Sequence, residues 1–112
     1  MKFMNNEQKA DSEALDRVET ESFGSICIEI AKERNSQDRK FPQNGKNTLA
    51  EWMLILSEEV GEAAKEACDT HFHPTPPEEV RTRILWRKLR YELIQVAAVT
   101  IVIIEWIDKK IG

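Results

Sequence analysis

Residues 52–62 read WMLILSEEVGE and residues 92–98 read ELIQVAA, and these two stretches define what kind of fold the chain can adopt. Both repeat apolar side chains at the spacing of an α-helix, and both carry polar side chains at the border of the apolar stripe. Within each stretch, two polar residues are three positions apart and share one helix face: Glu59 with Glu62, and Glu92 with Gln95. The pattern predicts two helices whose polar borders meet if the helices pack antiparallel.

Carboxylates that converge in a packed interface repel one another unless a cation binds between them. Here three carboxylates and one amide oxygen would converge, and hard divalent cations prefer oxygen ligands. The motif E-E-x-x-E alone is common on solvated helix faces, but both clusters here border apolar stripes. The sequence therefore predicts a Mg²⁺ site, with Mn²⁺ as a substitute, formed by Glu59, Glu62, Glu92 and Gln95.

The composition indicates one globular domain. The chain has 112 residues, 32% of them charged and 41% hydrophobic, which is typical of a soluble protein with a modest core. Its net charge is −4 and no long basic stripe is present, which argues against a duplex nucleic-acid partner.

Residues 96–104 are too short an apolar run to span a membrane. Cys27 and Cys68 match no metal or redox spacing, and the start of the chain has no apolar core of signal-peptide length, so we expect a cytoplasmic protein.

The expected organisation is a polar tail over residues 1–21, frayed except near its end, and a helical domain over residues 22–112. The first helix is expected from Ser22 to about Asn35. Residues 41–47 contain Pro, Asn and Gly and are expected to form a loop.

The second helix is expected to begin after Thr48, because Thr48 and Glu51 have the spacing of a capping box, and to end near Asp69. The third is expected from about Pro77 to Lys110. Such a helix would be on the order of 50 Å long, and its apolar positions continue to its end. Two partner helices can hardly cover them. We therefore expect an all-α fold with three main helices per chain and a bundle completed in a homodimer or homotetramer.

Three stretches together resemble the MazG-like family of all-α nucleoside triphosphate pyrophosphohydrolases, particularly its short phage and prophage forms. They are residues 33–37 (ERNSQ), residues 52–67 and residues 89–98, and the resemblance spans residues 25–108. The family's metal pattern is E-E-x-x-E followed by E-x-x-D. The resemblance assigns ligand positions to Glu59, Glu62 and Glu92, while Gln95 stands where the family usually has Asp.

The resemblance implies hydrolysis of a ribo- or deoxyribonucleoside triphosphate to the monophosphate and pyrophosphate, with Mg²⁺ as cofactor. Glu58 falls on an extra glutamate of the family pattern, and we assign it the catalytic role of orienting or deprotonating the attacking water. Gln95 keeps an oxygen donor but lacks the negative charge of Asp. This change is expected to weaken Mg²⁺ binding or to make metal binding depend more on Glu58. Alternatively, it indicates that the hydrolytic activity has been lost.

Candidate substrate-binding residues are a further set. Arg34 and Gln37 lie in a stretch that resembles the family's E-R-x-R-Q element and are assigned to a wall of the nucleotide pocket. Trp52 either stacks on the substrate or packs in the core, and the core is the favoured interpretation. The triphosphate needs cations, and the alternative for each candidate is a solvated side chain. These candidates are Lys65, Arg81 and Lys88.

Two other functions stay open. A phosphoribosyl-ATP pyrophosphohydrolase would share the fold and the bond cleaved, and complementation of a histidine auxotroph would distinguish it. A non-catalytic helical module that oligomerises or binds a partner would keep a vestigial acidic cluster, and Gln95 favours that interpretation. His71 and His73 could hold Zn²⁺ but lack two further ligands nearby, so they are assigned to a linker.

Overall fold

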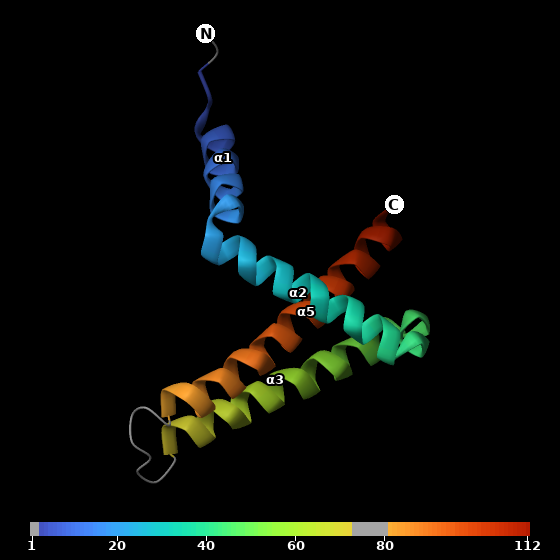
Figure 1. Ribbon diagram of the computed structural model, residues 1–112. Helices are drawn as coiled ribbons and strands as arrows, with labels where there is room; N and C mark the ends of the chain where they lie inside the picture. Colours follow the sequence, from blue (N-terminus) through green and yellow to red (C-terminus); the bar gives the residue numbers. More distant parts are fainter. Residues whose placement is uncertain (1–2, 73–80) are drawn as a thin grey trace.

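The computed structural model describes residues 3–72 and 81–112, and every regular element in these ranges is a helix (Figure 1). The all-α class predicted from the sequence is confirmed. In chain order the elements are α1 (Asn6–Glu19), α2 (Glu21–Lys40), the 3₁₀ helix η1 (Pro42–Lys46), α3 (Leu49–Phe72), the π-helical turn η2 (Arg81–Leu85) and α5 (Trp86–Ile111).

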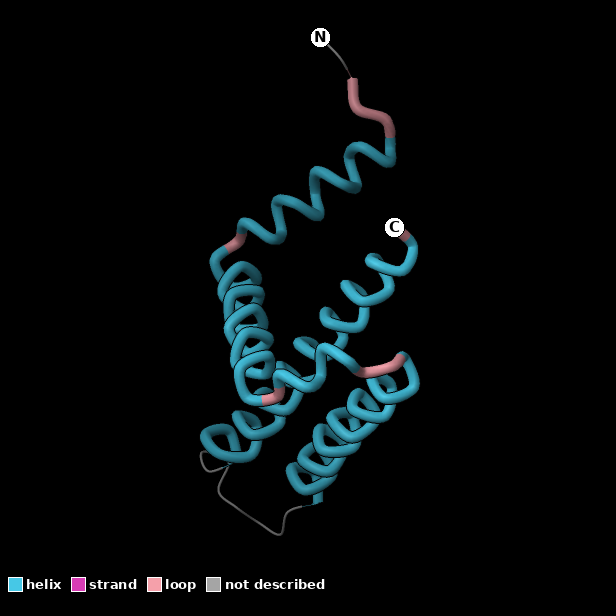
Figure 2. The backbone as a smooth tube through the Cα atoms, turned by 90° about the vertical axis from the view of Figure 1, so that its right-hand side faces the viewer, coloured by secondary structure: helices cyan, strands magenta, loops and turns pink. Residues whose placement is uncertain are grey.

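Helix α5 is the centre of a helical bundle. Helix α3 lies antiparallel beside it, α2 crosses it, and α1 contacts only α2 and extends away from the other helices (Figures 1 and 2). Because α2 and α3 both pack on α5 and not on each other, α5 fixes how the three longest helices are arranged.

The start of α3 is fixed by the predicted capping box. The backbone N–H of Thr48 donates to Oε1 of Glu51 (3.1 Å), and the backbone N–H of Glu51 donates to Oγ1 of Thr48 (3.2 Å). Two N–H groups that the first helical turn cannot pair are thereby satisfied. This prediction is confirmed.

The core lies between α3 and α5. Trp52 of α3 packs with Val99 and Ile103 of α5, and all three are buried. Partly buried apolar side chains surround this group: Ile55, Leu56, Val102 and Trp106. Burial of apolar side chains of this size contributes about 1.5–3 kcal/mol each. This packing therefore holds the two helices that carry the acidic clusters.

Helix α2 is held on α5 by polar contacts. Arg90 donates two hydrogen bonds to the carboxylate of Glu29, at 2.7 and 2.8 Å, and Arg34 donates one to Glu105 at 2.7 Å. No residue of α2 is buried. Charge pairs therefore contribute to this contact, which has no fully buried residue on the α2 side.

Several boundaries differ from the sequence-based expectations. The tail is not frayed over most of its length, because Asn5 and Gln8 form a capping box that starts α1 at Asn6. The first predicted helix continues beyond Asn35 to Lys40, and the predicted loop contains η1. Helix α3 continues to Phe72, three residues beyond the expected end.

The expected start of the third helix, at residues 77–79, lies outside the described residues, as does His73. From Arg81 onward the chain is helical to Ile111, with a π-helical turn before the regular helix. Among the described residues, no helix is long and apolar enough to cross a membrane.

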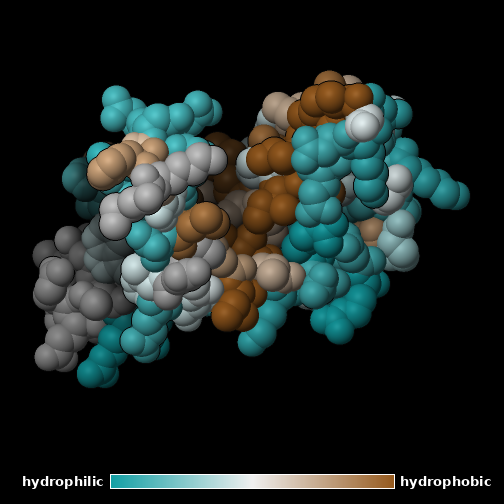
Figure 3. Space-filling view, turned by 90° about the horizontal axis from the view of Figure 1, so that it is seen from above, coloured by the Kyte–Doolittle hydropathy of each residue, from teal (hydrophilic) through white to brown (hydrophobic). Residues whose placement is uncertain are grey.

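The chain has an open shape. Its radius of gyration is 18.0 Å, whereas a compact domain of this length has about 13 Å. Its accessible surface of 8952 Å² also exceeds the roughly 6,300 Å² of a compact monomer of this size. Apolar side chains gather on the exposed face drawn in Figure 3.

Replacing Gly61 with Ala is expected to stabilise the protein. Gly61 lies inside α3, and a Cβ added there meets no atom of the described residues within 4 Å, so no close helix approach among these residues requires glycine. Alanine should raise the free energy of unfolding by about 1 kcal/mol, as measured by urea denaturation. A loss of stability together with a smaller particle in solution would instead place Gly61 in a contact between subunits.

Candidate functional site

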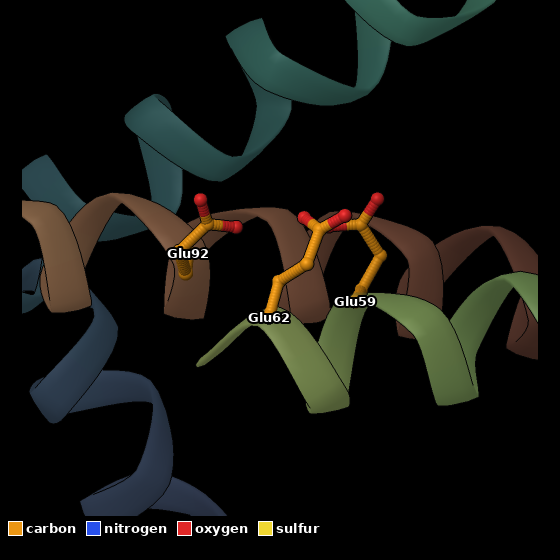
Figure 4. A group of neighbouring side chains, drawn as sticks. All are labelled: Glu59, Glu62 and Glu92. Carbon is orange, nitrogen blue, oxygen red and sulfur yellow. The ribbon is translucent and has the colours of Figure 1, made fainter. Parts of the chain in front are cut away.

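Three glutamates from two helices meet at the border of the α3–α5 contact. Glu59 and Glu62 project from α3 and Glu92 from α5, and one carboxylate oxygen of each lies within 4.8 Å of the others (Figure 4). Glu59 and Glu92 are half-buried, and Glu62 is exposed. The structure thus brings together three of the four residues predicted as metal ligands. We refer to Glu59, Glu62 and Glu92 as the carboxylate cluster.

The electrostatics of the cluster favour a bound cation. Burial raises the pKa of Glu59 above its ordinary value, and the charges of Glu62 and Glu92 raise it further. Burial also raises the pKa of Glu92, helped by the charge of Glu62 and by a hydrogen bond with it. A positive ion between the three would remove this penalty, because it supplies the opposite charge that the described residues do not place there.

The donor set suits a hard divalent metal. Carboxylate oxygens are the ligands that Mg²⁺, Mn²⁺ and Ca²⁺ prefer, and Mg²⁺ is commonly bound by one or two carboxylates together with waters and substrate phosphates. A cluster with one exposed and two half-buried carboxylates leaves room for such further ligands. The residues therefore fit the predicted cofactor.

Gln95 makes a contact that the sequence did not reveal. It is buried, and its Oε1 accepts a hydrogen bond from Nε2 of Gln37 at 2.9 Å. Its amide nitrogen has no hydrogen-bond partner among the described residues. The oxygen predicted to bind a metal is thus already engaged with α2, and the role of Gln95 as a ligand stays a prediction.

A cavity of about 400 Å³ lies between α2, α3 and α5, next to the carboxylate cluster. Its lining includes Glu58 and Glu59, the amides of Gln37 and Gln95, and Trp52. Further aromatic and aliphatic side chains complete its apolar walls: Phe41, Ile55, Tyr91, Val99 and Val102. We call it the central cavity. Its size is within the range of sites that bind small molecules, about 300–1,000 Å³.

The predicted cations have different positions. Lys88 lines a second hollow beside Glu92. Arg87 lines the same hollow, and the sequence-based set of candidate cations did not include it. Lys65 is exposed on α3 and lines neither the central cavity nor the hollow beside Glu92. Arg34 is paired with Glu105 and Asp38. The backbone of Arg81 lies in η2, but its side chain is outside the description.

Comparison of the chain with models of known protein families gave no match, and neither a curated protein nor a solved structure is significantly similar to it. The geometry of the site therefore carries the functional inference.

Replacing Glu59 with Gln is expected to stabilise the metal-free protein at pH 7. A carboxyl with a raised pKa stays protonated to higher pH when folded, so metal-free wild type should lose stability as pH rises through 4.5 and the raised value. The variant should lack this loss and show a higher Tm in EDTA. Saturating Mg²⁺, at 100 times its Kd, should stabilise the wild type by about 2.7 kcal/mol and the variant less.

Glu13→Gln, an exposed change on α1, is the matched control and should follow the wild type in both buffers. A lower Tm of Glu59→Gln in EDTA, or equal stabilisation of both proteins by Mg²⁺, would contradict this description of the site.

Proposed function

We propose that the protein is a Mg²⁺-dependent nucleotide pyrophosphohydrolase of MazG-like type, which hydrolyses a ribo- or deoxyribonucleoside triphosphate to the monophosphate and pyrophosphate. The observation that carries this proposal is the carboxylate cluster, whose oxygens lie within 4.8 Å of one another beside the central cavity. A cation-binding cluster next to a cavity of small-molecule size is what metal-assisted cleavage of a nucleotide requires.

Glu59, Glu62 and Glu92 are the residues that would hold the metal, with Mn²⁺ as a substitute for Mg²⁺. When bound, the ion supplies neutralisation of the phosphate charge and a water of lowered pKa. The residues themselves contribute position. The three carboxylates come from two packed helices, so a metal that they bind would lie at the border between α3 and α5. The substrate phosphates that contact this metal would be held at the same border.

Glu58 is the proposed base. It is exposed, neighbours Glu59 in sequence and lines the same central cavity. Its carboxylate can therefore orient a water at the border of the cavity and take a proton from it. Because Glu58 would act on the water, the three carboxylates of the cluster remain available to bind the cation.

Arg87 and Lys88 are proposed to bind the phosphates that leave as pyrophosphate. Both line the hollow that contains Glu92, on the side of the cluster where α5 begins. Negative charge builds up on the leaving group as the bond breaks, and nearby cations stabilise it. Lys65 lies outside this hollow. Arg34 contributes to the site by its hydrogen bond with Glu105, which joins α2 to α5.

The alternative is a non-catalytic helical module, and the engagement of Gln95 with Gln37 favours it. This link engages the oxygen of Gln95 with α2, so the three carboxylates are the ligands that the geometry brings together. Stabilisation of the protein by Mg²⁺ or Mn²⁺ distinguishes the two, because a vestigial cluster gives none. Cys27 and Cys68 are both free thiols, which fits action in a reducing cytoplasm.

We also propose that two or four chains complete the bundle. Exposed or half-buried side chains on α5 recur at alternating intervals of four and three residues, as in the seam between paired helices. They are Leu93, Ala97, Thr100, Ile104, Ile107 and Ile111. The surplus of accessible surface over a compact monomer, about 2,600 Å², is enough for a stable subunit contact.

The activity test uses pyrophosphate release from a panel of ribo- and deoxyribonucleoside triphosphates in Mg²⁺, Mn²⁺ or EDTA. Release should require metal. Glu62→Gln and Glu92→Gln should lower the rate by roughly 100-fold or more, since several kcal/mol of charge stabilisation depend on the ion. Glu58→Gln should keep metal-dependent stabilisation but lower kcat by roughly 100-fold. Glu13→Gln should behave as wild type; full activity of Glu62→Gln and Glu92→Gln would show that the site is elsewhere.

The assembly test replaces Ile104, which is half exposed on α5, with Glu. A charge in the proposed seam should dissociate the oligomer to monomers, as measured by light scattering at micromolar concentration. Leu15→Glu changes an exposed residue of α1 and should leave the oligomer intact. A wild-type monomer, or an unchanged mass for Ile104→Glu, would refute the seam.

A further inference from the structure

Tyr91 lies where three hollows of the site meet. It lines the central cavity, the hollow beside Glu92 that contains Arg87 and Lys88, and a further hollow between α2 and α5. No other residue lines all three of them. Because 58% of its surface is exposed, Tyr91 is open to a ligand that enters these hollows.

The carboxylate cluster lies at the same junction. Glu59 lines the central cavity and Glu92 lines the neighbouring hollow, and a carboxylate oxygen of each lies within 4.8 Å of the other. Tyr91 directly precedes Glu92 on α5, and it is the one residue that the linings of these two hollows share. A molecule that contacts a metal at the cluster and extends into both hollows therefore passes beside Tyr91.

A nucleoside triphosphate has two chemically different ends for these two hollows. Under the proposed function, its terminal phosphates contact Arg87 and Lys88 in the hollow beside Glu92. Its nucleoside then extends into the central cavity, whose volume of about 400 Å³ is that of a small-molecule site. A nucleobase is flat and uncharged, and the ring of an exposed tyrosine offers it an apolar face on which to stack.

We infer that Tyr91 is a substrate-binding residue whose ring stacks on the nucleobase of the substrate. The identity of the ligand as a nucleotide rests on the proposed function. Stacking tolerates every base because each has a π face, so Tyr91 contributes affinity for the nucleoside and no preference among the bases. The contact is remote from the bond that breaks and is the same in the bound substrate and in the transition state. Its loss therefore raises KM and leaves kcat unchanged.

The test compares ligands that carry a triphosphate with and without a nucleoside. The first are the α,β-methylene analogues of ATP and UTP, in which the bond to be cleaved is replaced, and the second is inorganic tripolyphosphate. Binding is measured by calorimetry in Mg²⁺. Tyr91→Ala should weaken binding of both analogues roughly tenfold, or about 1.4 kcal/mol, and leave binding of tripolyphosphate unchanged. Tyr91→Phe keeps the ring and should bind all three ligands as the wild type does.

Trp86→Ala is the matched control. Trp86 is also an aromatic residue of α5, it is 50% exposed, and it lines none of the three hollows. It should bind every ligand as the wild type does. Light scattering should give the wild-type mass for Tyr91→Ala, and a changed mass would assign Tyr91 to a contact between subunits and overturn the inference.

Four results of the calorimetry would also overturn the inference. They are unchanged binding of the analogues to Tyr91→Ala, an equal loss for tripolyphosphate, the same loss in Trp86→Ala, and a loss in Tyr91→Phe as large as in Tyr91→Ala. The last would show that the hydroxyl makes the contact and the ring does not.

The inference and the proposed function can fail separately. Metal-dependent pyrophosphate release with the same KM for the wild type and Tyr91→Ala would overturn the role of Tyr91 and leave the enzyme. Weaker binding of the analogues to Tyr91→Ala, without release from any triphosphate, would overturn the enzyme and support a nucleotide site at Tyr91. A wild type that binds neither analogue would overturn the inference.

Discussion

The packing of Trp52 against Val99 and Ile103 sets the register of α3 on α5, and the other features of the site follow from that register. The same contact that buries these apolar side chains places Glu59 and Glu62 opposite Glu92. The hydrophobic contact is nondirectional and strong, whereas the three carboxylates repel one another, and two of them are half-buried. The apolar core thus keeps the three carboxylates close together although they repel one another. Their burial and mutual repulsion raise the pKa values of Glu59 and Glu92.

Local patterns made much of the fold predictable. The capping box at Thr48 and the helical periodicity of residues 52–69 depend on spacings of a few residues, which a sequence displays directly. The convergence of Glu59 and Glu62 with Glu92 required one further assumption, that the two helices pack antiparallel. Asn5 and Gln8 form a capping box of the same kind, and it was missed because the polar composition of the tail outweighed it. The MazG-like topology and the assembly with other chains stay predictions.

The contacts that escaped prediction join residues far apart in the chain. Gln37 and Gln95 are 58 positions apart, and Arg90 and Glu29 are 61 apart. No periodicity marks such a pair, because the crossing position of α2 on α5 is set by the whole packing. Gln95, which was expected to complete a metal site, joins α2 to α5 through this hydrogen bond, and its role as a metal ligand stays a prediction. The three remaining carboxylates carry the charge of the site.

The two contacts made by α5 differ in their physical nature. Its contact with α3 contains the buried apolar core, while its contact with α2 includes the ion pairs Arg90–Glu29 and Arg34–Glu105 and one amide link. Salt screens partly exposed charges and barely weakens an apolar core. Rising salt is therefore expected to weaken the ion pairs between α2 and α5, while the apolar contact between α3 and α5, which positions the carboxylates, is barely affected.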